Sequence, residues 1–380
     1  LVAYPYIETT TAPVAGGILE DEPRIDFSDG CGHLLLEPSR TNAVTHSEYL
    51  NAIVSKSDSL EMNTADTQSP EGVYNASKFS FASGTRYIGP PVGDVNDIVF
   101  SVFAKSGTHN FVQFVTSSNN LFAVNFDLSD GSSNVVGTAP SELRYDAEDY
   151  GNGWYRIWFY YDNAATGATI YCWIVNSITA SRASSVSTSG DIYLYGFQAE
   201  QDATYPTSYI PTYGVSQTRL VDNVNLLNAA SFIGQTEGSY FIEWTAQQSD
   251  ETYSMFNLTD GTNDNRIQLS LNDSGNTPRL GFIYVVNGTS GYSNVAIQNL
   301  VEGQTYKFAV AYTESSLIAY LDGTQVINQT GLSLSGGVFN QISYSLKDGS
   351  VFKFSKPVKQ TIIFPTALSD SECIALTTIT

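Results

Sequence analysis

Two pairs of aromatic side chains recur at every second position of the chain. Tyr171 and Trp173 form one pair, and Tyr193 and Tyr195 form the other. Side chains two residues apart in a β-strand point to the same face, so each pair would present two rings side by side. Such rings can stack on the apolar face of a sugar while nearby polar groups take its hydroxyls. These four residues are candidate glycan-binding residues. The alternative is that the rings fill the interior of a sandwich, where aromatic side chains usually lie.

Catalytic patterns are missing from the sequence. No strand has the form Glu-x-Asp-x-x-Glu, which would place two carboxylates on one face for glycoside hydrolysis, and the acidic run at residues 20–22 is the nearest approach. His33, His46 and His109 occur singly, without the paired spacing of a zinc site. We therefore expect no enzyme and assign no catalytic residue. A polysaccharide-degrading enzyme, or its accessory binding module, is the alternative, because sandwich folds can host chemistry that no motif announces.

The charge balance is strongly acidic. The 380 residues include 38 Asp and Glu but only 17 Lys and Arg, which gives a formal net charge of −21. Phosphate binding needs clustered basic residues, so the composition argues against nucleic acid as a partner. It also argues against anionic membrane surfaces, and an anionic polysaccharide would be repelled unless a cation bridged it. No apolar run approaches the roughly 18 residues of a membrane-spanning helix, so we expect no membrane insertion.

The three cysteines carry little information. Cys31, Cys172 and Cys373 are odd in number and scattered, so they form neither a disulfide framework nor a metal-ligand pattern. Cys172 lies in an alternating apolar run, where we expect it to be a small buried side chain.

Short alternating runs separated by tight turns dominate the chain. Side chains alternate in polarity along residues 306–312, for example, and few residues favour long helices. Asp-Gly and Asn-Gly dipeptides between such runs are the strongest short-range signal of a β-hairpin. They occur at residues 130–131, 260–261, 287–288, 322–323 and 348–349. The pattern predicts an all-β protein of antiparallel β-sandwiches.

The length favours more than one hydrophobic core. Residues 1–33 are rich in Pro and Gly, with little periodicity, and we expect an extended N-terminal arm there. Two β-sandwich domains are predicted to follow, at residues 34–220 and 221–380, with the boundary near residues 219–228.

The first predicted sandwich resembles a carbohydrate-binding-like jelly-roll module of bacteriophage virion proteins, especially tail and fibre components. The resemblance is carried by residues 23–28 (PRIDFS), 34–42 (LLLEPSRTN), 151–156 (GNGWYR), 196–200 (GFQAE) and 205–212 (YPTSYIPT). It spans roughly residues 20 to 222, and it implies a virion building block rather than an enzyme. Residues 205–213, with Pro206 and Pro211, are expected to form a rigid exit strap packed on the sandwich.

The second half resembles a concanavalin A-like lectin domain of the laminin-G type. The matching segments are residues 238–244 (GSYFIEW), 306–312 (YKFAVAY), 319–324 (AYLDGT) and 363–369 (IFPTALS). A short C-terminal helix should follow, since Ser369 and Glu372 have the spacing of a capping box.

The jelly-roll resemblance also suggests a structural Ca²⁺ site. In many carbohydrate-binding jelly rolls the first and last strands lie close together and supply its oxygen ligands. The corresponding residues are Glu37, Glu200 and Asp202, whose carboxylates suit a hard cation. An ion pair such as Glu200 with Arg40, closing the sandwich without metal, is the alternative.

The function predicted from these resemblances is that of a non-catalytic virion surface protein. It would serve as a tail fibre, receptor-binding or capsid-decorating protein and would bind host-surface glycans. A purely structural virion scaffold is a further alternative, and a secreted or bacterial surface protein is an alternative location. We expect a homo-oligomer, most plausibly a trimer, or a copy bound to another virion protein through residues 1–33.

Overall fold

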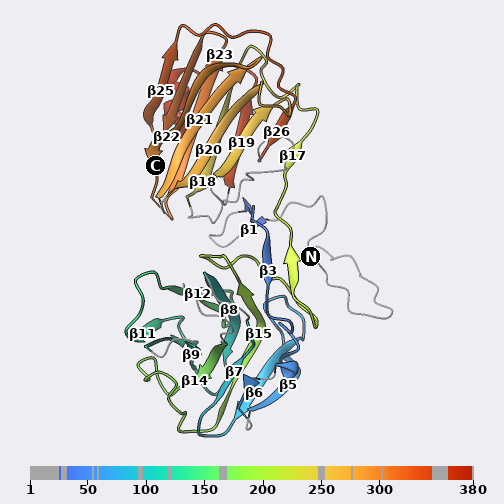
Figure 1. The fold of residues 1–380 in the computed structure, drawn as a ribbon, viewed down its shortest axis with the longest axis vertical. Coiled ribbons are helices and arrows are strands. Elements are labelled where there is room, and N and C mark those ends of the chain that lie inside the picture. Colours follow the sequence, from blue (N-terminus) through green and yellow to red (C-terminus); the bar gives the residue numbers. More distant parts are fainter. Residues whose placement is uncertain are drawn as a thin grey trace, which may run out of the picture. The chain divides into compact units, whose positions relative to one another are not determined.

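The chain forms two compact units in a computed structural model (Figure 1). The model describes residues 25–26, 32–53, 55–57, 60–92, 97–117, 121–161, 169–246, 253–274, 277–301, 303–344 and 358–378. The first unit contains Arg40–Arg219, and the second contains the described parts of Gly17–Ser39 and of Leu220–Thr380.

Two antiparallel sheets make up the described part of the first unit. The six-stranded sheet has the order β11-β10-β9-β14-β7-β4, and the eight-stranded sheet has the order β12-β13-β8-β15-β3-β16, with β6 and β5 paired beside β15. The strands of the six-stranded sheet are β4 (Ser55–Lys56), β7 (Tyr87–Gly89), β9 (Phe111–Thr116), β10 (Phe122–Asp127), β11 (Ser133–Gly137) and β14 (Ile170–Ile174). Those of the other sheet are β3 (Arg40–Asn42), β5 (Leu60–Thr67), β6 (Ala76–Phe81), β8 (Ile98–Ser106), β12 (Arg144–Asp149), β13 (Trp154–Tyr161), β15 (Gly190–Glu200) and β16 (Gln217–Arg219).

One apolar core fills the space between these two sheets. Phe100 of β8, Phe114 of β9 and Phe159 of β13 are fully buried, and their ring centroids lie 5.1–6.4 Å apart. Burying a side chain of this size stabilises the fold by about 1.5–3 kcal/mol. Cys172 is buried in the same core, as the sequence predicted.

The second unit is also a two-sheet sandwich. One sheet has the order β1-β2-β27-β18-β23-β24-β25 and the other has the order β17-β26-β19-β20-β21-β22. Their strands are β1 (Ile25–Asp26), β2 (His33–Leu34), β17 (Asn225–Leu226), β18 (Glu237–Thr245), β19 (Tyr253–Thr259), β20 (Arg266–Ser274), β21 (Thr277–Val286), β22 (Thr289–Asn299), β23 (Thr305–Thr313), β24 (Ser316–Leu321), β25 (Thr324–Thr330), β26 (Gln341–Ser343) and β27 (Val358–Phe364). The core between the sheets includes the ring pair Phe282 and Phe308, with centroids 5.9 Å apart.

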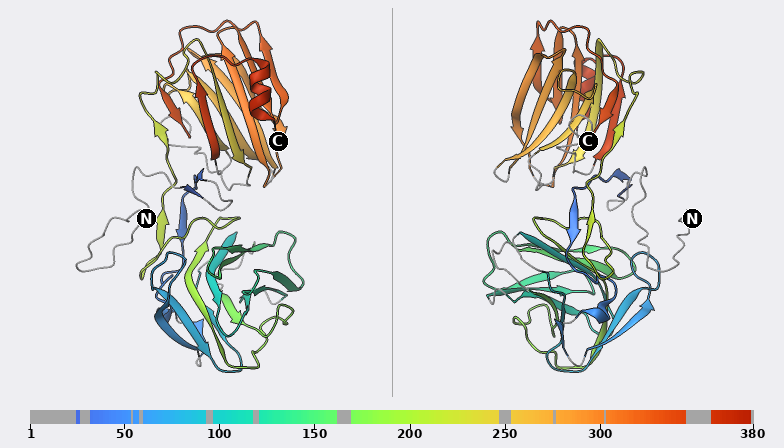
Figure 2. Two further views of the ribbon diagram at one scale, coloured as in Figure 1. Left: turned by 180° about the vertical axis from the view of Figure 1, so that it is seen from behind. Right: turned by 45° about the vertical axis from the view of Figure 1, so that its right-hand side comes forward.

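A helix of about two turns covers the outer face of one of these sheets. Helix α1 (Asp370–Thr377) lies against that sheet (Figure 2), where Cys373 packs among Phe241, Ala309 and other residues. Ser369 accepts a hydrogen bond from the backbone of Glu372, and the Glu372 side chain accepts one from the backbone of Ser369. The capping box predicted from the sequence is therefore confirmed.

The tight turns agree with the predicted hairpins. Asn287-Gly288 joins β21 to β22, and Asp322-Gly323 joins β24 to β25. The non-glycine residue of each pair has a φ of +47°, and the glycines have φ values of +72° and +77°. Two consecutive positive φ angles define the turn that suits the twist of a hairpin. The turn expected at residues 348–349 lies outside the described residues. Together the sheets and the short helix confirm the all-β, two-sandwich prediction.

The start of the chain departs from the predicted domain bounds. We expected residues 1–33 to be an arm and residue 34 to open the first sandwich. Instead, Leu34 of β2 pairs with Val358 of β27, and Leu36 is buried in the core of the second unit. The apolar run that begins at Leu34 thus adds part of a strand, which lies between β1 and β27, and a core side chain to the second sandwich. Residues 1–24 and 27–31 lie outside the described residues.

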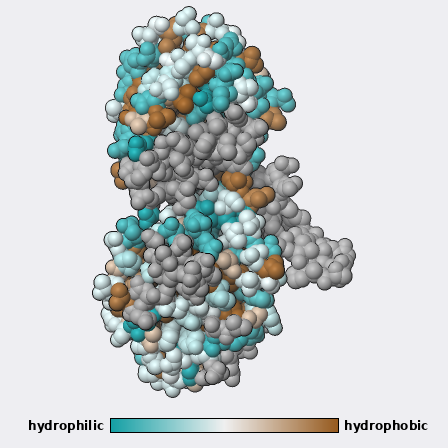
Figure 3. Space-filling model, in the orientation of Figure 1, coloured by the Kyte–Doolittle hydropathy of each residue, from teal (hydrophilic) through white to brown (hydrophobic). Residues whose placement is uncertain are grey.

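The part of the described surface that is seen in Figure 3 is mainly polar. In the view of Figure 3, hydrophilic and weakly polar side chains cover most of it, and hydrophobic side chains appear as scattered small groups. No helix among the described residues is long and apolar enough to span a membrane. Scattered hydrophobic side chains are normal on protein surfaces, so a binding site has to be found from local geometry.

Candidate functional site

Three aromatic rings form a cluster on the outer face of the six-stranded sheet. Tyr87 of β7 stacks on Trp173 of β14, with ring centroids 5.0 Å apart and planes at 27°, and it meets Tyr171 edge-on at 5.2 Å. All three side chains are half-buried. We call Tyr87, Tyr171 and Trp173 the aromatic ledge.

The alternation of β14 explains why these rings face outward. Along Ile170–Ile174, buried and half-buried side chains strictly alternate, and the buried ones belong to the core between the sheets. Tyr171 and Trp173 therefore share the outer face. These two rings therefore do not fill the sandwich interior, which was the alternative for them.

Glycine at position 89 lets the Tyr171 ring lie directly on the neighbouring strand. A Cβ atom at Gly89 would be 2.4 Å from Cδ1 of Tyr171, far inside van der Waals contact. The close approach brings Tyr171 down beside β7, where it meets Tyr87. Position 89 thus sets the height of one ring of the aromatic ledge.

A long loop covers the outer face beside the ledge. Residues 176–186 connect β14 to the segment before β15, and we call them the covering loop. Gln113 of β9 and Asn125 of β10, both fully buried, donate hydrogen bonds to its backbone carbonyls. The Gln113 side chain also accepts from the backbone N–H of Ala183 at 2.6 Å. Because Gln113 is the cross-strand neighbour of Trp173, the covering loop is fixed as a wall next to the aromatic ledge.

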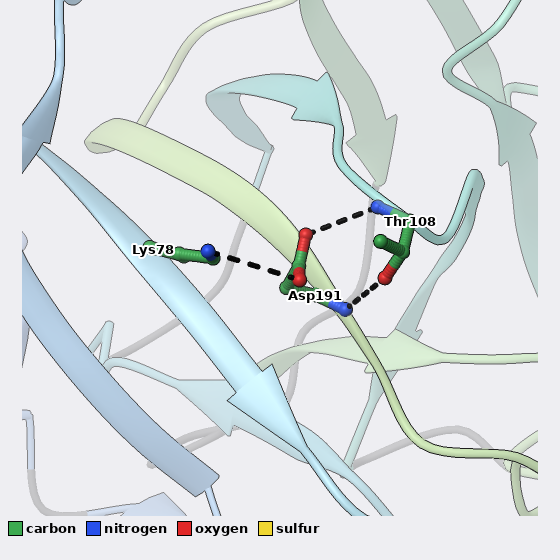
Figure 4. A network of polar contacts seen from close by, with 3 residues as sticks. All are labelled: Lys78, Thr108 and Asp191. Carbon is green, nitrogen blue, oxygen red and sulfur yellow. Dashed lines mark hydrogen bonds and ion pairs between the residues drawn. The ribbon is translucent and has the colours of Figure 1, made fainter.

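The second predicted aromatic pair lies on the outer face of the other sheet. Tyr193 is half-buried, and Nζ of its cross-strand neighbour Lys78 lies 5.8 Å from its ring centroid. Asp191 on the same strand contacts both Lys78 and Thr108 (Figure 4). Its carboxylate lies 3.9 Å from Nζ of Lys78 and accepts a hydrogen bond from the backbone N–H of Thr108 at 3.0 Å. Tyr193 is thus part of a polar surface network.

Tyr195 is covered. Only 1% of its surface is exposed, and it packs with Phe103, Trp154 and Tyr209, the last of these from the exit strap, residues 205–213. Of the four aromatic residues predicted for glycan binding, the structure therefore brings Tyr171 and Trp173 together on an accessible face. Tyr193 lies apart from them, and Tyr195 lies under the exit strap.

A half-buried carboxylate ties the exit strap to the sandwich. Oε1 of Glu48 accepts hydrogen bonds from the hydroxyls of Tyr195, Tyr209 and Tyr213 at 3.1–3.3 Å. Burial raises the pKa of the Glu48 carboxyl, the nearby charge of Glu71 raises it further, and the three phenol hydrogen bonds oppose the shift. No signal in the sequence pointed to Glu48, because its three tyrosine partners lie more than a hundred positions further along the chain.

Glu200 also holds the exit strap. It is fully buried, and its carboxylate accepts hydrogen bonds from the backbone N–H of Thr207, at 3.0 Å, and from the Thr207 hydroxyl. The buried side chains of Arg156 and Gln198 donate hydrogen bonds to the carbonyl of Thr207, at 2.7 and 3.2 Å. The expected packing of this strap on the sandwich is therefore observed, and a cluster of buried polar side chains produces it.

The three residues predicted to bind Ca²⁺ are placed in different surroundings. Glu37 belongs to the second unit, where its backbone N–H donates to Asp222. Glu200 binds Thr207 in the first unit, and Asp202 lies in an exposed turn with a φ of +52°. Among the described residues, no group of three or more His, Cys, Asp or Glu side chains is arranged to hold a metal ion. Ca²⁺ binding stays a prediction.

Comparison with known proteins gives only distant structural matches. No family model and no curated protein matches the sequence. Among solved structures, the carbohydrate-binding module CBM40 of the Ruminococcus gnavus IT-sialidase, bound to α2,3-sialyllactose, is 16% identical with a TM-score of 0.32, and the match covers 41% of this chain and 96% of that one. Domain 4 of a Geobacillus stearothermophilus GH43 arabinanase, in complex with arabinotriose, is 14% identical with a TM-score of 0.30 and covers 43% and 77%. A heptameric SAP-like pentraxin from Limulus polyphemus is 15% identical with a TM-score of 0.29 and covers 38% and 72%.

Proposed function

We propose that this protein is a non-catalytic surface protein that binds host-surface glycans through the aromatic ledge. The observation that carries the proposal is the outward orientation of Tyr87, Tyr171 and Trp173, which form a contiguous ring surface. Aromatic side chains normally bury their faces in a core, so three rings gathered on an outer face suit a ligand with an apolar face and polar edges. A pyranose ring has both.

We further propose that the glycan-binding unit is displayed on a virion as a tail fibre, receptor-binding or capsid-decorating protein. The support is the resemblance of five sequence segments to jelly-roll modules of phage virion proteins. A single shallow sugar site leaves little free energy after ordering costs, and many copies on a particle multiply weak contacts. A homo-oligomer, with a trimer as the favoured state, would supply those copies.

The ledge can be tested by binding of immobilised glycans to the full chain. Trp173→Ala and Tyr171→Ala should each weaken binding about tenfold or more, because each removes a stacking surface worth about 1–2 kcal/mol. Tyr145→Ala is the matched control, since this ring is 36% exposed on β12 of the other sheet. Equal binding by all three variants would refute the ledge. Loss of viscosity or new reducing ends from a polysaccharide would indicate an enzyme instead.

A further inference from the structure

The aromatic ledge and its wall are built from segments that contain no acidic residue. Residues 82–92, 111–117 and 169–189 supply β7, β9, β14 and the covering loop, and none of them is Asp or Glu, although the chain has 38 of these residues. The same segments contain Arg86 and Arg182. These segments thus carry a positive charge on a protein whose formal net charge is −21.

Arg182 extends along the strand next to the ledge. Its neighbour Ala183 is fixed over Gln113, and Nη2 of Arg182 donates to the carbonyl of Thr116 at 2.9 Å. The Arg182 side chain therefore runs along β9 from the level of Gln113 to that of Thr116. Tyr171 lies opposite Val115 on the adjacent strand, so the guanidinium is about one strand spacing, ~4.8 Å, from the backbone of β14. The Tyr171 ring leans toward β7, on the other side of β14, so a sugar stacked on the ledge would have to reach across β14 to meet the guanidinium.

The charge of Arg182 is not neutralised by a neighbour. Arg182 is half-buried and makes no ion pair among the described residues. Burial lowers the pKa of its guanidinium, with no nearby carboxylate to oppose the shift. Arg86 differs, because its guanidinium donates to the carbonyls of Ala82, Ser83 and Thr85 in its own loop.

Polar atoms around Arg182 are also incompletely paired. Nε of Arg182, Oγ of Ser184 and Nε1 of Trp173 are buried and have no hydrogen-bond partner in the described part of the protein. Most buried polar groups in proteins are paired with protein or water, so these three atoms can take a partner from water or from a ligand. The three atoms belong to the covering loop and to the ledge that it adjoins.

Resting on the proposed glycan-binding role of the ledge, we propose that Arg182 makes this site selective for glycans that carry a carboxylate. The sugar ring stacks on Tyr171 or Trp173, and the carboxylate accepts hydrogen bonds from the guanidinium. Arginine presents parallel N–H groups that match the two oxygens of a carboxylate, which lysine cannot do. The site would therefore distinguish a uronic acid from its neutral ester.

The experiment uses the full chain and a glycan array that holds acidic oligosaccharides, their methyl esters and neutral oligosaccharides. Wild type should bind acidic members about tenfold or more tightly than the matched esters, as hydrogen bonds to charged groups are the stronger ones. Arg182→Gln should abolish that preference. Arg182→Lys, which keeps the charge and can still reach Thr116, should retain part of it even if the glutamine variant folds poorly. Lys105→Gln is the control, since it removes a positive charge from β8 of the other sheet.

The outcomes separate the two proposals. If wild type binds acidic glycans and their esters equally, or if Arg182→Gln keeps the preference, the role of Arg182 is wrong and the ledge remains. If wild type binds neutral glycans through Trp173 but no acidic ones, the role of Arg182 is again wrong, while the glycan-binding role of the ledge stands. If no glycan binds at all, the proposed function fails, and the inference fails with it.

Discussion

The carboxylate of Glu48 offers the sharpest test of how the exit strap is held. Its Oε1 is the shared acceptor for the hydroxyls of Tyr195, Tyr209 and Tyr213. Replacing Glu48 with Ala removes that acceptor, whereas Gln keeps an oxygen in its place. The two variants therefore separate the hydrogen bonds from the negative charge.

The loss of stability expected for Glu48→Ala depends on the hydrogen-bond partners that each tyrosine hydroxyl keeps. Tyr209 still donates to Oγ of Ser47 at 2.7 Å, and Tyr213 is 42% exposed and can bond to water. Tyr195 is 1% exposed; Asn75 donates to its hydroxyl, and the side chain of Glu71 is a second carboxylate beside it. A hydrogen bond to a charged acceptor contributes about 1.5–3 kcal/mol, and each tyrosine keeps another contact, so Glu48→Ala should destabilise the first unit by about 2 kcal/mol. Glu48→Gln should cost less than about 0.5 kcal/mol at neutral pH.

The dependence on pH has a definite sign. Because the pKa of Glu48 is raised in the folded state, the folded protein holds the proton more tightly than the unfolded chain does. The charged form is therefore a penalty at neutral pH, and this penalty disappears as the pH falls through the folded pKa to the ordinary value of 4.5. Relative to Glu48→Gln, wild type should gain stability over that interval and stay constant below it.

Calorimetry of the full chain between pH 4 and pH 8 would measure both effects, with the transition of each unit assigned separately. Glu142→Gln is the matched control, because Glu142 is an exposed carboxylate of the same unit. Equal losses in Glu48→Ala and Glu48→Gln would show that the charge, and not the shared acceptor, holds the strap. A stable Glu48→Ala variant would refute the argument.

Three further predictions concern the ledge, the strap and the helix. Gly89→Ala should push the Tyr171 ring off β7, weaken glycan binding and destabilise the first unit by about 1–3 kcal/mol, measured by array binding and thermal unfolding. Glu200→Gln should cost about 1–3 kcal/mol through its weakened bonds to Thr207, equally in calcium and in chelator; a loss seen only in calcium would support the metal site instead. Ser369→Ala should lower the stability of the second unit by about 1 kcal/mol in the same calorimetric experiment, and an unshifted transition would contradict the role of the cap.

Local features of the fold could be predicted from the sequence because their causes are local. The capping box of Ser369 and Glu372 spans four residues, and the turns at residues 287–288 and 322–323 depend on two residues each. Strand alternation likewise predicted that Tyr171 and Trp173 share a face. It could not say which face, since that depends on where the opposing sheet packs.

The rest of the site depends on pairings between distant segments. Tyr87 joins the ledge only because β7 lies beside β14 in the sheet. Glu48 meets its tyrosines only because the exit strap returns to the start of the first unit. The placement of Leu34 in the second sandwich has the same origin, since its partner Val358 comes near the end of the chain. Side-chain type and spacing within one segment carry no signal of these contacts.

The net charge of the whole chain is a poor guide to the charge of the ligand. A charge of −21 argued against acidic ligands, yet a carboxylate ligand responds to the groups within about 8 Å at physiological ionic strength, because salt screens exposed charges beyond that distance. The segments that form the ledge and the covering loop contain two arginines and no acidic residue. On the proposal made above, Arg182 sets the potential at the ledge, while the acidic residues that give the negative net charge lie elsewhere in the sequence. The ligand class is therefore best inferred from the residues that the fold gathers at the ledge.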